Sequence, residues 1–222
     1  MTTPVVLLHG FAASSATTWA GPGWLALLEE AGHRPVALDL LGHGEAPHPH
    51  DAAAYADVED RVVDQLPPGP VDAVGFSAGA RVLLVLAAAD PSRFRRLVIA
   101  GVGANLFDRA DRGPLAAMIR QSIPPDDHTG RHFHRLARAP GNDPLALAAF
   151  MERPEPVLDT SLLAQVAVPT LVVLGDRDFA GPADPLVDAL PDARLEVLTG
   201  ADHFATPKDL RFIDLTLDHL AS

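Results

Sequence analysis

The sequence predicts an α/β protein built on a doubly wound, mainly parallel sheet of about six strands. Six short runs rich in valine, leucine and other apolar residues recur along the 222 residues. Continuous apolar runs of this kind suit strands that are buried on both faces of a parallel sheet. Helix-length amphipathic stretches separate most of the runs, which indicates βαβ units with helices on both faces. A chain of this length is compatible with one domain and can bury a substantial core.

The expected strands and helices alternate along the chain. The strands are expected at Val5–His9, Pro35–Asp39, Val71–Phe76, Leu97–Val102, Thr170–Gly175 and Leu195–Leu198. The main helices are expected at Thr17–Ala31, Ala52–Gln65, Ala78–Ala89, Pro182–Ala189 and Pro207–Leu220.

The alternation breaks once, between Asn105 and Val168, where no strong strand pattern occurs. Short helical patterns at Gly113–Gln121, Pro144–Met151 and Ser161–Val166 are separated there by prolines and glycines. A structureless loop of this length would be unusual in a compact domain. We therefore expect a small helical insertion after the fourth strand.

The clearest chemical pattern is the pentapeptide GFSAG at residues 75–79. It follows a predicted strand and opens an apolar helix, which is the context that makes a G-x-S-x-G pattern informative. A sharp strand-to-helix turn would present the Ser77 hydroxyl, and Gly75 and Gly79 would permit close approach of the backbone. The following amide, from Ala78, would face a developing oxyanion at the helix N-terminus. Ser77 is therefore the candidate nucleophile.

A serine nucleophile needs a base, and the base needs a group that orients it. His203 follows the sixth predicted strand and is the candidate base. Asp178 follows the fifth strand and is the candidate acid, while Asp176 in the same GDRD stretch stays open as an alternative. Because the carboxyl ends of parallel strands meet at one rim of a sheet, these residues are expected to converge on Ser77.

The tripeptide HGF follows the first predicted strand and is expected at the same rim. The Phe11 amide is the candidate second oxyanion donor beside that of Ala78, and His9 and Gly10 complete this loop. The side chain of His9 is interpreted as structural rather than as a base. His43, in the turn DLLGHG after the second strand, is interpreted in the same way.

Composition and charge exclude several other classes. The absence of cysteine excludes disulfides, thiolate metal sites and a cysteine nucleophile. A formal charge of −12 disfavours nucleic acid as a partner and argues against a highly anionic substrate. Neither a signal peptide nor a membrane-spanning run is evident, so a cytoplasmic protein that binds no membrane is expected.

No metal and no cofactor are expected. The glycine-rich turns lack the patterns of nucleotide-binding loops. His128, His132 and His134 cluster in the insertion, and the last two could be ligands in an extended segment, but no carboxylate has a persuasive metal-ligand spacing. Trp19 and Trp24 are interpreted as helix packing residues.

Taken together, HGF, DLLGHG, GFSAG, GDRD and GADHF resemble the α/β-hydrolase fold superfamily, in order and in spacing. The resemblance covers nearly the whole chain outside the insertion. It implies Ser77 as nucleophile, Asp178 as acid, His203 as base, and Phe11 and Ala78 as oxyanion donors through their backbones.

The resemblance also implies a division of the chain into a core, residues 1–104 and 169–222, and a helical cap, residues 105–168, which shapes the substrate pocket. Members commonly carry two antiparallel strands before the HGF strand; here that strand begins at residue 4 or 5, so these two are expected to be missing. Residues of the cap are candidate pocket walls, although each could equally belong to the core of the cap: Phe107, Met118, Ile119, Phe133, Leu136, Phe150 and Met151.

These observations predict a serine hydrolase that cleaves a carboxylic ester, or a closely related acyl bond, of a small to medium molecule. The alternative within enzymes is a C–C bond, thioester or lactone hydrolase, or a lyase, on the same triad, because this fold hosts many reactions. A non-catalytic ligand-binding protein on a hydrolase scaffold is the third interpretation. A small-molecule substrate is the one partner expected, and the sequence does not indicate an oligomeric state.

Overall fold

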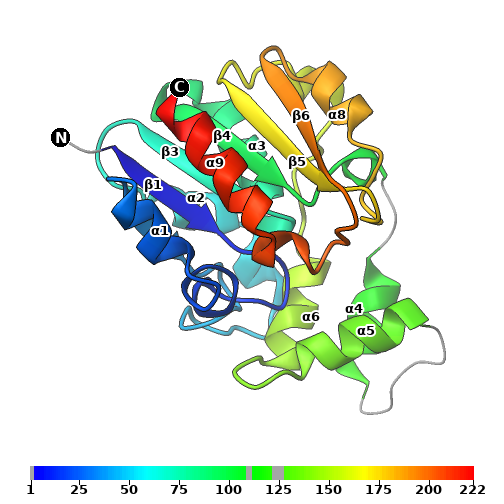
Figure 1. The fold of residues 1–222 in the computed structure, drawn as a ribbon. Coiled ribbons are helices and arrows are strands. Elements are labelled where there is room, and N and C mark those ends of the chain that lie inside the picture. Colours follow the sequence, from blue (N-terminus) through cyan, green and yellow to red (C-terminus); the bar gives the residue numbers. More distant parts are fainter. Residues whose placement is uncertain (1–2, 109–111, 122–127) are drawn as a thin grey trace.

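The computed structural model describes residues 3–108, 112–121 and 128–222 of the chain (Figure 1). Six strands form one sheet in the order β2-β1-β3-β4-β5-β6. All five neighbouring pairs are parallel, so the predicted six-stranded parallel sheet is confirmed. The strands are β1 (Pro4–Leu8), β2 (Arg34–Leu38), β3 (Val71–Phe76), β4 (Phe94–Ala100), β5 (Thr170–Gly175) and β6 (Ala193–Leu198).

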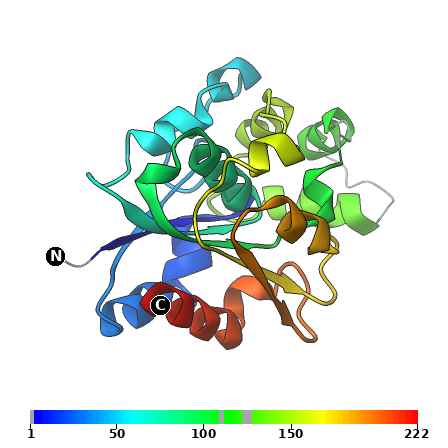
Figure 2. The same cartoon turned by 90° about the horizontal axis from the view of Figure 1, so that it is seen from above.

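Helices cover both faces of this sheet (Figure 2). The α-helices are α1 (Trp24–Glu30), α2 (Val58–Val63), α3 (Ala78–Ala89), α4 (Gly113–Arg120), α5 (His128–Ala137), α6 (Pro144–Glu152), α7 (Thr160–Leu163), α8 (Asp184–Ala189) and α9 (Leu210–Ala221). Shorter helical turns are Ala16–Ala20, Ala52–Tyr55, Pro91–Arg93, Ala104–Leu106 and Thr206–Lys208. Among the helices described, none is long and apolar enough to cross a membrane.

The core has two layers because successive side chains of a strand point to opposite faces of the sheet. In β1, Val5 and Leu7 pack with Trp24 and other residues of the α1 and α9 side. Val6 and Leu8 belong to the core of the opposite face, to which α2, α3, α7 and α8 also contribute. These four residues of β1 are fully buried, which explains why the strand reads as an unbroken apolar run.

Two expected long helices are each divided in two. The stretch Thr17–Ala31 forms a π-helical turn, Ala16–Ala20, and then α1. Gly23, with φ of 93°, separates them, because this left-handed conformation cannot continue a right-handed helix. The stretch Ala52–Gln65 likewise forms a 3₁₀ turn followed by α2.

Helix α5 was not among the helices expected from the sequence. Its sequence, HTGRHFHRLA, has three apolar side chains, those of Phe133, Leu136 and Ala137. They share one face at the helical spacing i, i+3, i+4 and leave the opposite face polar, so this amphipathic pattern was a signal from which the helix could have been predicted. Residues 109–111 and 122–127 of the predicted cap lie outside the described part of the chain, and the division into core and cap stays a prediction.

Candidate active site

Ser77 occupies a sharp turn between β3 and α3. Its backbone has φ of 52° and ψ of −110°, a combination that costs a non-glycine residue roughly 1–3 kcal/mol. A Cβ on Gly75 would lie 2.7 Å from the Cα of Ala80, and a Cβ on Gly79 would lie 2.4 Å from the Leu8 carbonyl oxygen. Glycine is therefore needed on both sides of Ser77, as the pentapeptide GFSAG predicts.

Three side chains from the ends of β3, β5 and β6 meet at this turn. The Ser77 hydroxyl oxygen lies 3.1 Å from Nε2 of His203. Nδ1 of His203 lies 2.9 Å from each carboxylate oxygen of Asp178. A proton on Nδ1 that is donated to Asp178 leaves Nε2 free to accept the Ser77 hydroxyl proton. This geometry can support nucleophilic catalysis.

Asp178 is held in position by more than His203. Its side chain is fully buried, and Oδ1 also accepts a hydrogen bond of 2.8 Å from the Ala180 amide. The alternative acid, Asp176, is solvent-exposed and accepts a hydrogen bond of 2.7 Å from the Gly200 amide. Asp176 therefore joins two turns of the backbone, whereas Asp178 contacts the imidazole.

Two backbone amides lie in the loops beside Ser77. Ala78 is the first residue of α3, and such an amide has no acceptor within its own helix. The Gly79 amide donates to the His9 carbonyl oxygen at 3.0 Å and holds the HGF loop against the start of α3. Among the described residues, no backbone carbonyl accepts from the Phe11 amide. Both amides are thus suited to an oxyanion.

His9 orients the peptide that carries the Phe11 amide. Its Nδ1 donates to the Gly10 carbonyl oxygen at 2.8 Å, and its Nε2 accepts from the Leu40 amide at 3.1 Å. The Gly10 carbonyl and the Phe11 N–H belong to one peptide unit, so this bond fixes the direction of the N–H. Burial lowers the pKa of His9, despite the opposing effects of Gly10 and Asp39, which agrees with a neutral structural histidine.

His43 supports the same loop from behind. It is fully buried, and its Nδ1 donates to the Leu41 carbonyl oxygen at 3.0 Å. Its ring packs edge-on against Phe11 and Phe150, with centroids 5.8 and 4.7 Å away. Burial, followed by the nearby His9, sets the pKa of His43 well below its ordinary value. Like His9, it makes no hydrogen bond to the Ser77 hydroxyl, which is the contact that a catalytic base needs.

A cavity of about 470 Å³ opens over Ser77 and His203. Four of the expected cap walls line it: Phe133, Leu136, Phe150 and Met151. The other three do not. Phe107 lines a neighbouring cavity, Ile119 is buried within the insertion, and Met118 lines neither of these two cavities.

Two aromatic walls were missed in the sequence. The Phe179 ring lies 4.3 Å from the His203 ring, and the Phe204 ring lies 5.3 Å from it, between centroids. Both line the cavity over Ser77. Their signal was their position, since each directly follows a proposed triad residue in the chain. Trp19 and Trp24 are fully buried against the sheet, as expected of packing residues.

The insertion histidines are not arranged as the metal hypothesis would require. His132 and His134 lie in helix α5 rather than in an extended segment, and Nε2 of His134 donates to the Gln121 carbonyl oxygen at 2.9 Å. The side chain of His128 lies outside the described part. Within the described residues, no group of three or more potential ligands could hold a metal ion.

Comparison with known proteins defines the class. Residues 3–121 match the family described as the alpha/beta hydrolase fold, and the chain belongs to this family. A pimeloyl-[acyl-carrier protein] methyl ester esterase of Neisseria meningitidis serogroup B is 31% identical over 197 residues, which span 75% of this chain and 74% of the relative. A 2-hydroxymuconate semialdehyde hydrolase of Pseudomonas sp. strain CF600 is 28% identical over 248 residues, 98% of this chain and 87% of the relative.

Solved structures agree on the fold. The enol-lactonase from Burkholderia xenovorans LB400 superimposes with a TM-score of 0.79 at 20% identity, over 100% of this chain and 92% of that one. NosK from Streptomyces actuosus has a TM-score of 0.73 at 22% identity, over 100% of this chain and 98% of that one. The chain is thus an enzyme of the α/β-hydrolase family, within its esterases and hydrolases.

Proposed function

We propose that this enzyme hydrolyses a carboxylic ester of a small to medium molecule, with Ser77 as nucleophile, His203 as base and Asp178 as orienting acid. The observation that carries the proposal is the continuous hydrogen-bonded series from Ser77 to His203, at 3.1 Å, and from His203 to Asp178, at 2.9 Å. A cavity of about 470 Å³ at Ser77 suits a small-molecule site. The similarity to a methyl ester esterase supports the choice of an ester.

The proposed reaction has two steps. His203 Nε2 takes the hydroxyl proton as Ser77 Oγ attacks the ester carbonyl carbon, and the amides of Phe11 and Ala78 bind the resulting oxyanion. The imidazolium then protonates the departing alcohol, which leaves an acyl-enzyme. His203 next removes a proton from water, which attacks the acyl carbon, and the proton returns to Ser77 as the acid departs. Asp178 holds the histidine tautomer and stabilises its cation.

Covalent labelling tests the nucleophile directly. A fluorophosphonate probe is expected to modify the native protein at Ser77, identified by peptide mass spectrometry, and to spare Ser77→Ala. That variant should lose about 10⁴–10⁶ in kcat on 4-nitrophenyl esters. The exposed Ser92 on the turn before β4 supplies the control variant Ser92→Ala, which should keep full labelling and activity. Retention of more than about a tenth of the hydrolysis by Ser77→Ala contradicts the mechanism.

A second candidate is hydrolysis of a C–C bond beside a ketone on the same triad. It is favoured by the similarity to 2-hydroxymuconate semialdehyde hydrolase, which extends over 98% of this chain. Product analysis on matched ester, thioester, lactone and diketone substrates separates these reactions. A folded protein that neither takes the probe nor turns over any of the panel would instead favour a non-catalytic ligand-binding role.

A further inference from the structure

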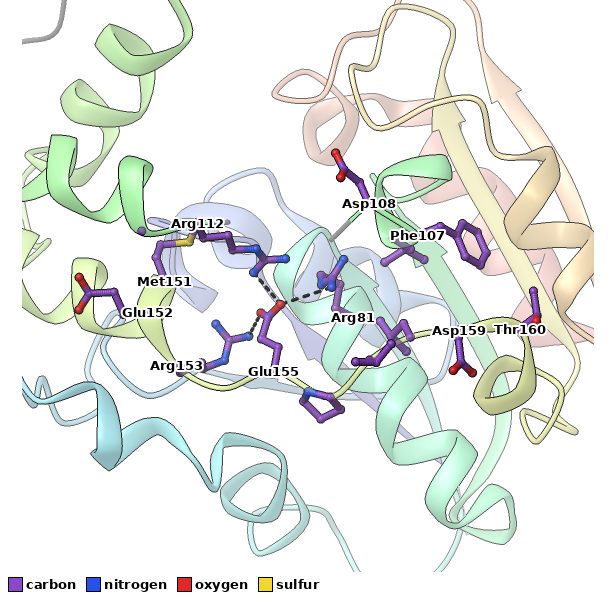
Figure 3. A pocket seen from close by; sticks show the side chains of 15 residues that line it. Arg81, Phe107, Asp108, Arg112, Met151, Glu152, Arg153, Glu155, Asp159 and Thr160 are labelled. Atoms are coloured by element: carbon purple, nitrogen blue, oxygen red, sulfur yellow. Dashed lines mark hydrogen bonds and ion pairs between the residues drawn. The ribbon is translucent and has the colours of Figure 1, made fainter. Parts of the chain in front are cut away.

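A second cavity of about 570 Å³ adjoins the one over Ser77. We call the cavity over Ser77 the inner cavity and its neighbour the outer cavity. Arg81, Arg112 and Met151 line both, so the two cavities share a wall that carries two guanidinium groups. Figure 3 shows these arginines, together with Arg153, converging on Glu155.

Arg81 lies close to the proposed nucleophile along helix α3. Its amide donates to the Ser77 carbonyl oxygen at 3.1 Å, so the two residues are one helical turn apart and on the same side of the helix. Arg112 approaches from the insertion, directly before α4. Two cationic side chains from separate parts of the chain thus reach the wall beside Ser77.

A single carboxylate faces three guanidinium groups in the shared wall. Glu155 Oε2 lies 2.7 Å from Arg112 Nη1 and 3.3 Å from Arg81 Nη2, and Oε1 pairs with Arg153. Although burial acts to raise the pKa of Glu155, Arg153, Arg112 and Arg81 together lower it, so Glu155 is ionised. Burial lowers the pKa of Arg153 to about 10, which leaves it charged at neutral pH. The cluster therefore carries a net positive charge.

The two cavities differ in the charges of their linings. The charged residues that line the inner cavity are Arg81, Arg112 and Lys208, and none of the described residues that line it is an aspartate or a glutamate. The outer cavity has the opposite balance, with three arginines and the four carboxylates of Asp108, Glu152, Glu155 and Asp159. In a chain with 29 acidic and 17 basic residues, a purely cationic lining must have a local cause.

We propose that Arg81 and Arg112 form a subsite of the inner cavity for a carboxylate carried by the substrate, so that the enzyme prefers an ester with a free acid a few bonds from the scissile carbonyl. This inference rests on the proposed function and adds a substrate class to it. Each guanidinium has five N–H donors in a fork that matches a carboxylate, and both arginines share the one Glu155 carboxylate, through Oε2. The largely apolar lining of the inner cavity strengthens the attraction, because charges attract one another more strongly in less polar surroundings. The negative charge of the whole chain argues against an anionic substrate, but the charges that line the cavity govern binding there.

The test compares esters that differ at the far end of the acyl chain. One member of each pair is a hydrogen 4-nitrophenyl ester of a dicarboxylic acid, from succinate to suberate, and the other is the uncharged 4-nitrophenyl alkanoate with the same number of carbons. At the best chain length, kcat/KM of the wild type should be at least about tenfold higher for the carboxylate ester, as expected for charge-assisted hydrogen bonds. Arg81→Gln and Arg112→Gln should lower this ratio about tenfold or more, mainly through KM. The proposal is overturned if the wild type prefers the carboxylate ester at no chain length. It is also overturned if the arginine variants lower kcat/KM by the same factor for the charged and the uncharged ester.

Two further variants guard against a merely structural effect. Arg120 belongs to the same insertion and pairs with Glu152, but it does not line the inner cavity, so Arg120→Gln should leave the ratio unchanged. Arg81→Lys keeps the charge but loses the fork, and should recover part of the preference that Arg81→Gln loses. The subsite does not exist if Arg81→Lys and Arg81→Gln give the same ratio of the two kcat/KM values and Arg120→Gln lowers that ratio as much as they do.

A binding measurement separates the subsite from the reaction. Adipate titrated calorimetrically into Ser77→Ala should bind about tenfold or more tightly than to Ser77→Ala/Arg81→Gln. If this difference is found while the wild type hydrolyses no ester, the subsite stands and the proposed reaction fails. If the wild type hydrolyses both members of each pair equally and adipate binding ignores Arg81, the subsite fails and the proposed reaction stands.

Discussion

The Asp176 carboxylate accepts a hydrogen bond from the Gly200 amide, 2.7 Å away, and so joins the turn after β5 to the turn after β6. Two residues later, the buried Asp178 carboxylate lies with both oxygens 2.9 Å from His203 Nδ1. Two aspartates in one short stretch therefore have different partners: the first contacts backbone and the second contacts the imidazole. The two positions consequently make a matched pair for mutagenesis.

We expect Asp178→Asn to lower kcat by about 10⁴, because an amide that donates to Nδ1 would select the wrong histidine tautomer. Asp176→Asn keeps an acceptor for the Gly200 amide and should change kcat by less than about tenfold, with a loss of roughly 1 kcal/mol or less in stability. Steady-state hydrolysis of a 4-nitrophenyl ester and urea unfolding measure the two effects. The opposite order of kcat values would make Asp176 the acid.

The strained backbone at Ser77 is expected to lower the stability of the folded protein, so a residue that tolerates these angles should stabilise it. The backbone of Ser77 has φ of 52° and ψ of −110°, so Ser77→Gly should relieve roughly 1–3 kcal/mol of strain. Glycine also gives the unfolded chain more freedom, which offsets about 0.4–1 kcal/mol of that gain. The free energy of unfolding, measured in urea, should therefore be about 1 kcal/mol higher for Ser77→Gly than for Ser77→Ala. Both variants should be inactive.

Ser161 provides the control for this comparison, because it lies within helix α7. There glycine should be less stable than alanine by about 0.5–1 kcal/mol. If glycine is also the less stable substitution at position 77, the turn is not strained in solution.

The sequence was sufficient for the sheet and for the residues that follow its strands. Strands buried on both faces must be continuously apolar, and chemistry placed at strand ends is bound to share a rim. Ser77 and His203 could therefore be paired in advance, although 126 positions separate them. The sequence favoured Asp178 over Asp176, and the folded chain adds that the Asp178 carboxylate contacts His203 while that of Asp176 contacts the Gly200 amide.

The insertion was harder to predict because its helical patterns are short and are separated by prolines and glycines. Helix α5 has a narrow apolar stripe, and nothing in the sequence distinguishes Phe133, which lines the inner cavity, from Ile119, which is buried within the insertion. The Arg81 and Arg112 pair was also invisible, because it combines a core helix with a distant segment. Local periodicity carries no information about such tertiary contacts.

Close packing between α3 and β1 makes Gly79 intolerant of a side chain. Its added Cβ would lie 2.4 Å from the Leu8 carbonyl oxygen and 2.7 Å from that of His9, so the backbone of the HGF loop would have to move. Gly79→Ala should lower the unfolding free energy by about 2 kcal/mol or more and should reduce kcat, since the Phe11 amide would shift. At Gly21 the nearest backbone atom is 3.3 Å away, so Gly21→Ala should lose less than about 1 kcal/mol and keep its kcat. Equal losses from both substitutions in urea unfolding would count against this account.

The two buried histidines behind the HGF loop predict that stability falls in mild acid. Burial lowers the pKa of His9 and lowers that of His43 further, so the unfolded chain binds protons near pH 6.5 while the folded chain does not. Stability is therefore full above that pH and declines as the pH falls below it, by up to about 1.4 kcal/mol per pH unit for each histidine. His43→Asn retains a donor toward the Leu41 carbonyl oxygen but cannot be protonated. Its unfolding free energy, measured in urea between pH 7 and 5, should decline less steeply than that of the wild type, and the carboxyl groups common to both proteins cancel in the difference. Parallel curves would mean that His43 takes up its proton equally in the folded and unfolded states.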